Sequence, residues 1–220
     1  MILSTRRLAL RNLTMLPVLI QAATLSGAGS AAALASVADA QGPVAALESA
    51  LLRIMQAGER TPFMQRYDML APVVQSTFDL PLVLQLVVGF GWNSMSPQQK
   101  QTLMTAFTNY SVATWVSNFD SYSGQRFQFL PNYNRSMGPS QVIVATQIVS
   151  ASGTTHRLDF VMRLTPAGWK AVDVLADNIS RLATLRSDFS SLVAGDRSGA
   201  TLAQALRKKA TDLATSEAPV

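Results

Sequence analysis

The stretch WKAVDVLADNISRLATLRSDF, residues 169 to 189, joins a predicted strand to a predicted helix through a short polar turn. Its first six residues are mostly apolar and begin with Trp169, which is typical of a strand that is buried on both faces. In its second half, apolar residues recur at helical spacing, at Ile179, Leu182, Leu185 and Phe189. A helix of this kind packs back against the sheet, and the two layers can enclose a cavity.

The pattern of the remaining chain changes from helical to extended near residue 125 and becomes helical again at residue 179. Helices are predicted over residues 42–56, 61–74, 81–88, 97–121, 179–193 and 199–213. Strands are predicted at residues 127–129, 142–149, 157–164 and 169–174. We therefore expect an α+β fold in which a four-stranded antiparallel meander carries helices packed on one face.

Two local signals refine the predicted helices. Ser96-Pro97-Gln98-Gln99 combines a capping serine, a proline in the first turn and a glutamine three residues after the cap, so it predicts the start of a long helix. Pro72 lies inside the second predicted helix, where the missing N–H group should break or kink it.

The predicted strand over residues 157–164 alternates between apolar and charged positions, which is typical of a sheet with one face in water. Its apolar set is Leu158, Phe160, Met162 and Leu164, and its charged set is Arg157, Asp159 and Arg163. The apolar face is therefore free to line an interior.

The first forty residues have the features of a cleavable export signal. A start with three arginines precedes a mostly apolar run over residues 13–25, and a small-x-small site ends at Ala40. We expect cleavage near Ala40, so that residues 1–40 are the signal and residues 41–220 form a single domain. Residues 5–10 also resemble a twin-arginine signal, and both the Sec and the twin-arginine routes stay open.

The composition argues against several classes of function. The chain has no cysteine and one histidine, so we expect no metal site and no cofactor. A Ser-His-Asp apparatus could use only His156, and we predict no enzyme. Basic residues give a formal net charge of +5 but are scattered, so we predict no nucleic-acid partner.

The dense cluster Arg207-Lys208-Lys209 lies near a predicted helix end, where cations offset the helix dipole. Docking of this cluster to an acidic partner or to an anionic membrane is the alternative.

Three ionisable residues are candidates for a specific role. Asp173 lies within an apolar strand and must find donors, for which we consider the backbone amides of the following turn or Arg186 on the next helix. The helical spacing places Arg186 among Leu182, Leu185 and Phe189, and Arg186 could instead reach a ligand. His156 shares the face of Leu158, which places it either at a cavity mouth or simply at a strand end near solvent.

Several short motifs occur in a fixed order along the chain. They are Tyr67 to Val74, Phe78-Asp79-Leu80-Pro81, Gly89 with Trp92, Ser96 to Gln99 leading to Phe107 and Tyr110, Tyr122 with Gly124, Trp169 to Phe189, and Gly199 with Leu202 and Leu206. This ordered set, over roughly residues 43–210, resembles the MlaC-like family of periplasmic lipid-binding proteins, also called toluene-tolerance or auxiliary transport proteins. The first two motifs resemble the hopanoid-associated HpnM branch in particular. The family usually has a glycine where this chain has Asn178, which also tolerates a left-handed backbone.

The resemblance implies a monomeric periplasmic lipid carrier with an apolar lipid pocket. It implies a hopanoid or a phospholipid as the ligand, an inner-membrane ABC transporter assembly as one partner and an outer-membrane acceptor or donor complex as the other. The side chains expected to line the pocket are Val83, Val87, Trp92, Phe107, Tyr110, Trp115, Leu158, Phe160, Met162, Trp169 and Leu182. An enzyme on a cone-shaped α+β scaffold and a periplasmic adaptor without a ligand stay open as alternatives.

Overall fold

A computed structural model describes residues 28–58 and 60–216 of the chain. Its helices are α1 (Ala28–Ala57), α2 (Phe63–Thr77), α3 (Leu80–Val88), α4 (Pro97–Asn118), α5 (Arg181–Gly195) and α6 (Ala200–Ser216), with short 3-10 segments η1 (Gly89–Ser94) and η2 (Pro131–Tyr133). Its strands are β1 (Arg126–Phe129), β2 (Arg135–Ser136), β3 (Gln141–Val149), β4 (Thr155–Thr165), β5 (Gly168–Ala176) and β6 (Ile179–Ser180). The predicted α+β class, with helices on either side of an antiparallel strand region in the sequence, is confirmed.

The described strands form one sheet of six strands, so the predicted number of four is wrong. The order is β1-β3-β4-β5-β6, and β2 pairs with β3 beside this path. All four predicted strands are present, but β2 and β6 were missed because each has two residues, too few to show a period. Ile179 was predicted to start a helix but belongs to β6; the helix starts after Ser180, whose side chain accepts a hydrogen bond from the Ala183 amide.

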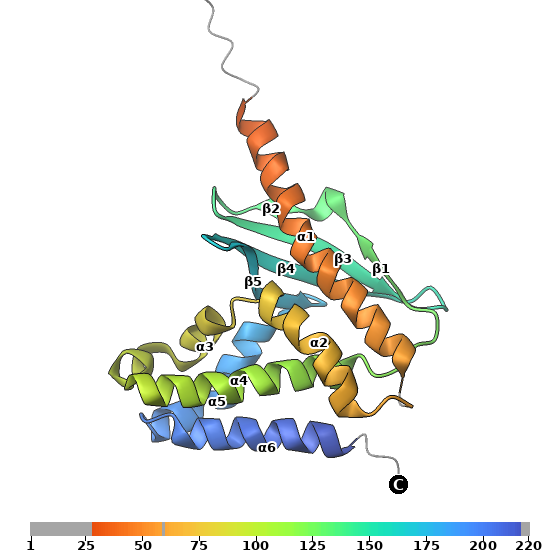
Figure 1. The fold of residues 1–220 in the computed structure, drawn as a ribbon. Helices are drawn as coiled ribbons and strands as arrows, with labels where there is room; N and C mark the ends of the chain where they lie inside the picture. The colour runs from red at the N-terminus through yellow and green to blue at the C-terminus, as the bar shows by residue number, and fades with distance from the viewer. Residues whose placement is uncertain (1–27, 59, 217–220) are drawn as a thin grey trace, which may run out of the picture.

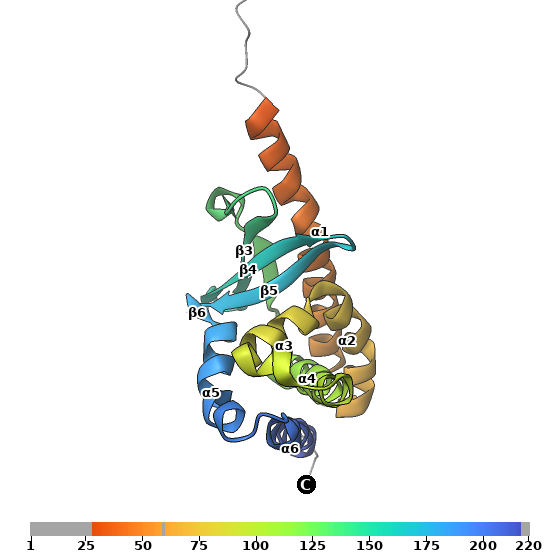
Figure 2. The same ribbon diagram turned by 90° about the vertical axis from the view of Figure 1, so that its left-hand side faces the viewer.

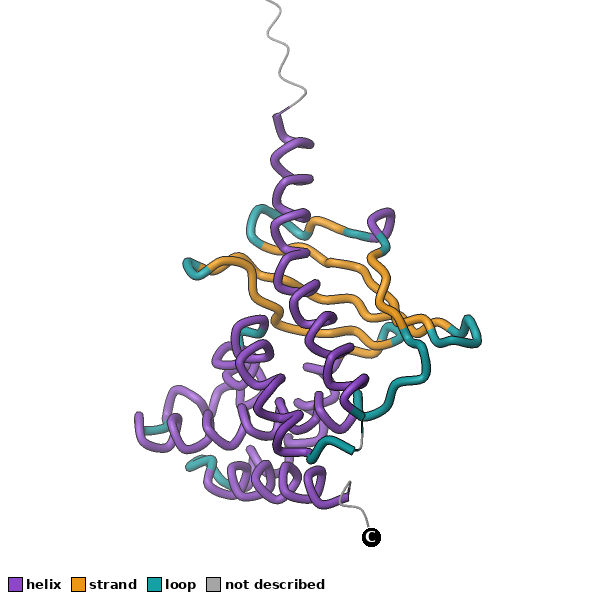
Figure 3. The backbone as a smooth tube through the Cα atoms, turned by 45° about the vertical axis from the view of Figure 1, so that its right-hand side comes forward, coloured by secondary structure: helices purple, strands orange, loops and turns teal. Residues whose placement is uncertain are grey.

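The helical layer lies against one side of the sheet, as Figures 1 and 2 show from two directions. In Figure 3, α1 crosses the strands and continues beyond them, while α2 to α6 gather under the sheet. The capping box predicted at Ser96 is formed with Gln99, so α4 begins at Pro97 as expected. Helix α2 continues through Pro72, which is exposed, so the lost hydrogen bond lies on the water side of a helix that does not break.

Helix α1 is longer than the sequence predicted, because it begins at Ala28 instead of near Gly42 and crosses the predicted cleavage site. Ala40 itself is buried. The remainder of the predicted export signal, residues 1–27, lies outside the described residues. Over the part of the chain that the structure describes, no helix combines the length and the apolar character needed to cross a membrane.

The alternation predicted for β4 holds at Phe160 and Met162 but fails at Asp159 and Leu164. Phe160 and Met162 are fully buried, whereas Leu164, beyond an irregularity in the pairing with β5, is 44% exposed. Asp159, expected in water, is only 3% exposed. The segment around η2 explains the burial of Asp159. Tyr133 stacks on Arg157, and Arg157 forms a 2.7 Å ion pair with Asp159.

Candidate functional site

A pocket of about 480 Å³ lies between the sheet and the helices α4 and α5. Its walls come from the ends of β3 and β4, the second half of β5, the second half of α4 and the first turns of α5, with one residue of α1 and two of α3. Its apolar lining includes Met55, Phe78, Leu80, Val83, Phe107, Trp115, Phe119, Ile148, Leu158, Val172, Val174, Leu182 and Leu185. This volume lies within the usual range for small-molecule sites, about 300–1,000 Å³.

Aromatic rings form one continuous side of this pocket. The ring centroids of Phe78 and Trp115 are 5.7 Å apart, and those of Trp115 and Phe119 are 5.6 Å apart in a stacked arrangement. Phe127 on β1 extends the row at 6.1 Å from Phe119. Offset and tilted rings at these distances attract one another, so the wall keeps its shape beside an open space.

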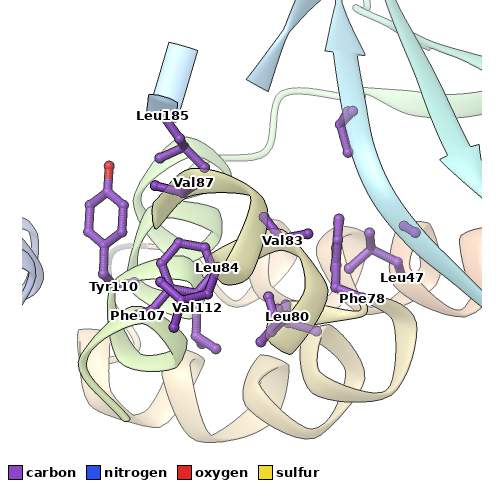
Figure 4. Close-up of a cluster of buried hydrophobic side chains, with 14 of the residues drawn as sticks. Leu47, Phe78, Leu80, Val83, Leu84, Val87, Phe107, Tyr110, Val112 and Leu185 are labelled. Carbon is purple, nitrogen blue, oxygen red and sulfur yellow. The ribbon is translucent and has the colours of Figure 1, made fainter. Parts of the chain in front are cut away.

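Six of the eleven side chains that the sequence suggested lie in the lining of this pocket. They are Val83, Phe107, Tyr110, Trp115, Leu158 and Leu182. Val87, Phe160, Met162 and Trp169 are instead part of the buried core, and Trp92 packs on its edge, with the Lys100 ammonium 5.4 Å from its ring. Figure 4 shows how closely α3, α4 and α5 meet around Val83, Val87, Phe107 and Leu185.

The mouth of the pocket carries a hydrogen-bonded histidine–aspartate pair. His156 Nδ1 lies 2.9 Å from Asp177 Oδ2, and both side chains are more than half exposed. The hydrogen bond from His156, aided by the backbone amide of Arg157, lowers the pKa of Asp177. The turn that positions Asp177 uses left-handed backbone at Asp177 and at Asn178, with φ of 47° and 69°, so Asn178 takes the conformation expected of it.

Asp173 is the structural anchor of the helix that closes the pocket. Its carboxylate accepts hydrogen bonds from the amides of Val174 and Leu182 and from the Ser180 hydroxyl. The first of the two expected partners, backbone amides at the following turn, is thus confirmed. Arg186 is exposed on α5, so its expected position among buried side chains is wrong.

Arg181 is a pocket residue that the sequence analysis missed. It is the first residue of α5, it is partly buried, and its Nη2 donates a 3.0 Å hydrogen bond to the Tyr110 hydroxyl. The sequence offered one signal for Arg181. A cation directly after the capping residue opposes the helix dipole, so its presence there asks for a reason other than helix stability. Tyr110 also makes an edge-to-face contact with Phe189, at 6.0 Å between ring centroids.

A buried carboxyl group lies close to the pocket without lining it. Glu48 on α1 is 5% exposed, and burial raises its pKa to about 7, while the hydrogen-bonding side chain of Thr146 opposes the shift. Within the described residues, Glu48 Oε1 has no hydrogen-bond partner. Thr146 itself donates to the carbonyl oxygen of Leu158, so this polar pair lies directly beside the pocket wall.

The arrangement can hold an apolar molecule. Among residues 28–58 and 60–216 there is no group of three or more His, Cys, Asp or Glu side chains that could hold a metal ion. The polar groups His156, Asp177 and Asp173 are engaged with one another or with backbone amides. What remains is a space with mostly hydrocarbon walls and a polar mouth.

Comparison with known proteins identifies a family and a solved structure of the same fold. A phospholipid-binding protein from Ralstonia solanacearum, solved in complex with a phospholipid, has the same fold with a TM-score of 0.69 at 20% sequence identity, over 80% of this chain and 99% of that one. A family model described as MlaC protein matches residues 46–208, which include every residue of the pocket lining. The chain therefore belongs to the MlaC family.

Proposed function

We propose that this protein is a periplasmic lipid carrier that binds the hydrocarbon part of a phospholipid or a hopanoid in the pocket between the sheet and the helices α4 and α5. The observation that carries the proposal is the match to the MlaC family over the residues that form this pocket. The phospholipid in the Ralstonia protein of the same fold favours a phospholipid. The family also favours binding and transport over catalysis.

The energetics of such a carrier require only shape and exclusion of water. Each buried methylene group contributes about 0.8 kcal/mol, so one long acyl chain gains on the order of 10 kcal/mol in a dry pocket. A carrier must also release its cargo, and the left-handed positions at Gly89 and Asn178 are candidate hinges for opening the helical wall.

The wider role follows from the family resemblance. The protein would be exported by its N-terminal signal, act as a monomer, and carry lipid between an inner-membrane ABC transporter assembly and an outer-membrane complex. The motifs at residues 67–74 and 78–81 resemble the hopanoid-associated HpnM branch, which makes a hopanoid the second candidate cargo.

The test is native mass spectrometry of the full chain, purified from the periplasm of a Gram-negative host. Wild-type protein should carry co-purified lipid. Ser111 lies on the pocket wall, and Ser111→Phe should fill the space and remove the lipid. Thr102→Phe, at an exposed position of the same helix, adds the same ring and should retain it.

Each rival function predicts a different outcome, the adaptor in native mass spectrometry and the enzyme in an activity assay. A ligand-free adaptor would arrive without lipid in all three forms. An enzyme would depend on its polar groups, so His156→Ala would abolish a turnover that the pocket-filling variant only impairs.

A further inference from the structure

Arg181 differs from the other charged groups of the pocket because no carboxylate neutralises it. Its hydrogen bond goes to the neutral Tyr110 hydroxyl, and no acidic group among the described residues lies within ion-pair distance. A guanidinium group carries five N–H donors, so most of them stay free to bind something else.

Apart from Asp120, the other charged groups of the pocket lining are matched within the protein. Arg157 pairs with Asp159 at 2.7 Å, and His156 pairs with Asp177 at 2.9 Å. Asp173 accepts three hydrogen bonds at the start of α5. Each of these groups therefore has a structural role within the protein, whereas no such role accounts for the charge of Arg181.

Asp120 is the other unmatched charge of the lining, and it lies just beyond the C-terminal end of α4. Asn118, where α4 ends, is about 12 Å along the helix axis from Tyr110, and Asp120 follows it. The lining thus carries an unmatched carboxylate just after α4 and an unmatched cation at the start of α5.

Stability does not account for a cation at this position. The first turn of a helix disfavours positive charge, and partial burial removes water from the guanidinium group. Tyr110 can accept one hydrogen bond but cannot neutralise the charge. Figure 4 shows the Tyr110 ring rising from α4 with its hydroxyl oxygen at the far end, where it can orient the guanidinium group.

We infer that Arg181 and Tyr110 form an anion-binding subsite that receives the acidic group of the cargo. The chemistry is a phosphate ester or a carboxylate, because both present two oxygens to the planar fork of an arginine. The inference rests on the proposed function, since it requires an amphiphile in the pocket. It predicts selection of acidic lipids over neutral lipids with the same hydrocarbon.

The experiment measures the affinity of delipidated full-length protein for three fluorescent probes. They are a phosphatidylglycerol, a fatty acid, and a diacylglycerol with the acyl chains of the first probe but no acidic group. Arg181→Gln should weaken binding of the acidic probes about tenfold or more and leave the diacylglycerol unchanged. Arg186→Gln removes the same charge from an exposed position of α5 and should change none of the three.

Two further variants keep the test decisive if Arg181→Gln folds poorly. Arg181→Lys keeps the charge but loses the fork, so it should cause a smaller loss for the acidic probes. Tyr110→Phe keeps the ring and loses the hydroxyl, and should act in the same direction. Loss for phosphatidylglycerol alone identifies a phosphate, and loss for the fatty acid alone identifies a carboxylate.

The inference is overturned if Arg181→Gln binds the acidic probes as Arg186→Gln does, or if it loses the diacylglycerol in parallel. A different result separates the proposed function from the inference. If wild-type protein binds none of the three probes, the carrier function itself fails.

Discussion

Two parts of the space between the sheet and the helices are bordered by the same strands, but one part is filled by side chains and the other stays open as the pocket. Around Phe160 and Met162, helix α1 lies across the sheet and protein side chains fill the space. Around Leu158 and Ile148, near the other end of the strands, the side chains border the pocket. The alternation of β4 decides which side chains face the helices, but the paths of the helices decide whether that face is filled.

The largest effect is expected from removing a side chain in the filled part. Phe160→Ala should lower the free energy of unfolding by about 3–5 kcal/mol, because the substitution leaves a cavity that the surrounding core can fill only in part. Leu158→Ala should cost less, about 2 kcal/mol, since Leu158 already borders open space. Urea denaturation followed by circular dichroism measures both. Equal losses would mean that the surroundings of Leu158 are packed as tightly as the core.

The sequence could predict the filled part better than the pocket. Strand alternation and helical spacing locate apolar faces, and they identified Phe160, Met162, Leu158 and Phe107 as facing inward. They could not separate the core from the pocket, because both use the same residue types. That difference depends on where α1 ends and how α5 leaves β6, which no local pattern contains.

The next effect concerns Glu48, which is buried between the filled part and the pocket. Its pKa rises from 4.5 to about 7 on folding, so the folded protein holds a proton that the unfolded chain releases. The stability present below pH 4.5 is therefore lost as the pH rises through about 7. Glu48→Gln should remove this slope and stabilise the protein at pH 8 by at most about 3 kcal/mol.

Denaturation at several pH values between 4 and 8 tests the role of Glu48. Asp68→Asn, at an exposed position of α2, is the matched control and should retain the wild-type slope. A slope unchanged by Glu48→Gln would show that the Glu48 carboxyl group is not the one that titrates.

A smaller effect is expected at the start of α5, on the pocket side of the comparison. Ser180→Ala removes the cap that accepts from the Ala183 amide and donates to Asp173, and should cost about 1 kcal/mol. Ser190→Ala, exposed farther along the same helix, should cost clearly less. Thermal unfolding of both variants gives the comparison, and an equal shift in the two would contradict a specific role for the cap.

The polar residues of the site show a second limit of sequence analysis. Asp173 was recognisable because a carboxylate within an apolar strand needs donors, and backbone amides did prove to supply them. Arg181 and Arg186 lie on the same predicted helix, and the wrong one was chosen as buried. The error came from the helical spacing, which groups Arg186 with Leu182, Leu185 and Phe189, although the structure leaves Arg186 exposed.

The smallest effect is expected from His156→Ala at the pocket mouth. The His156–Asp177 pair is exposed and contributes little to stability in water. Because the pKa of Asp177 is lowered on folding, the contribution of the pair is present above the ordinary pKa of an aspartate and is lost only in acid. Unfolding at pH 7 should thus change least in this variant, and native mass spectrometry should still find the lipid. If His156→Ala emptied the pocket as completely as Ser111→Phe, the polar mouth and not the hydrocarbon wall would be what retains the cargo.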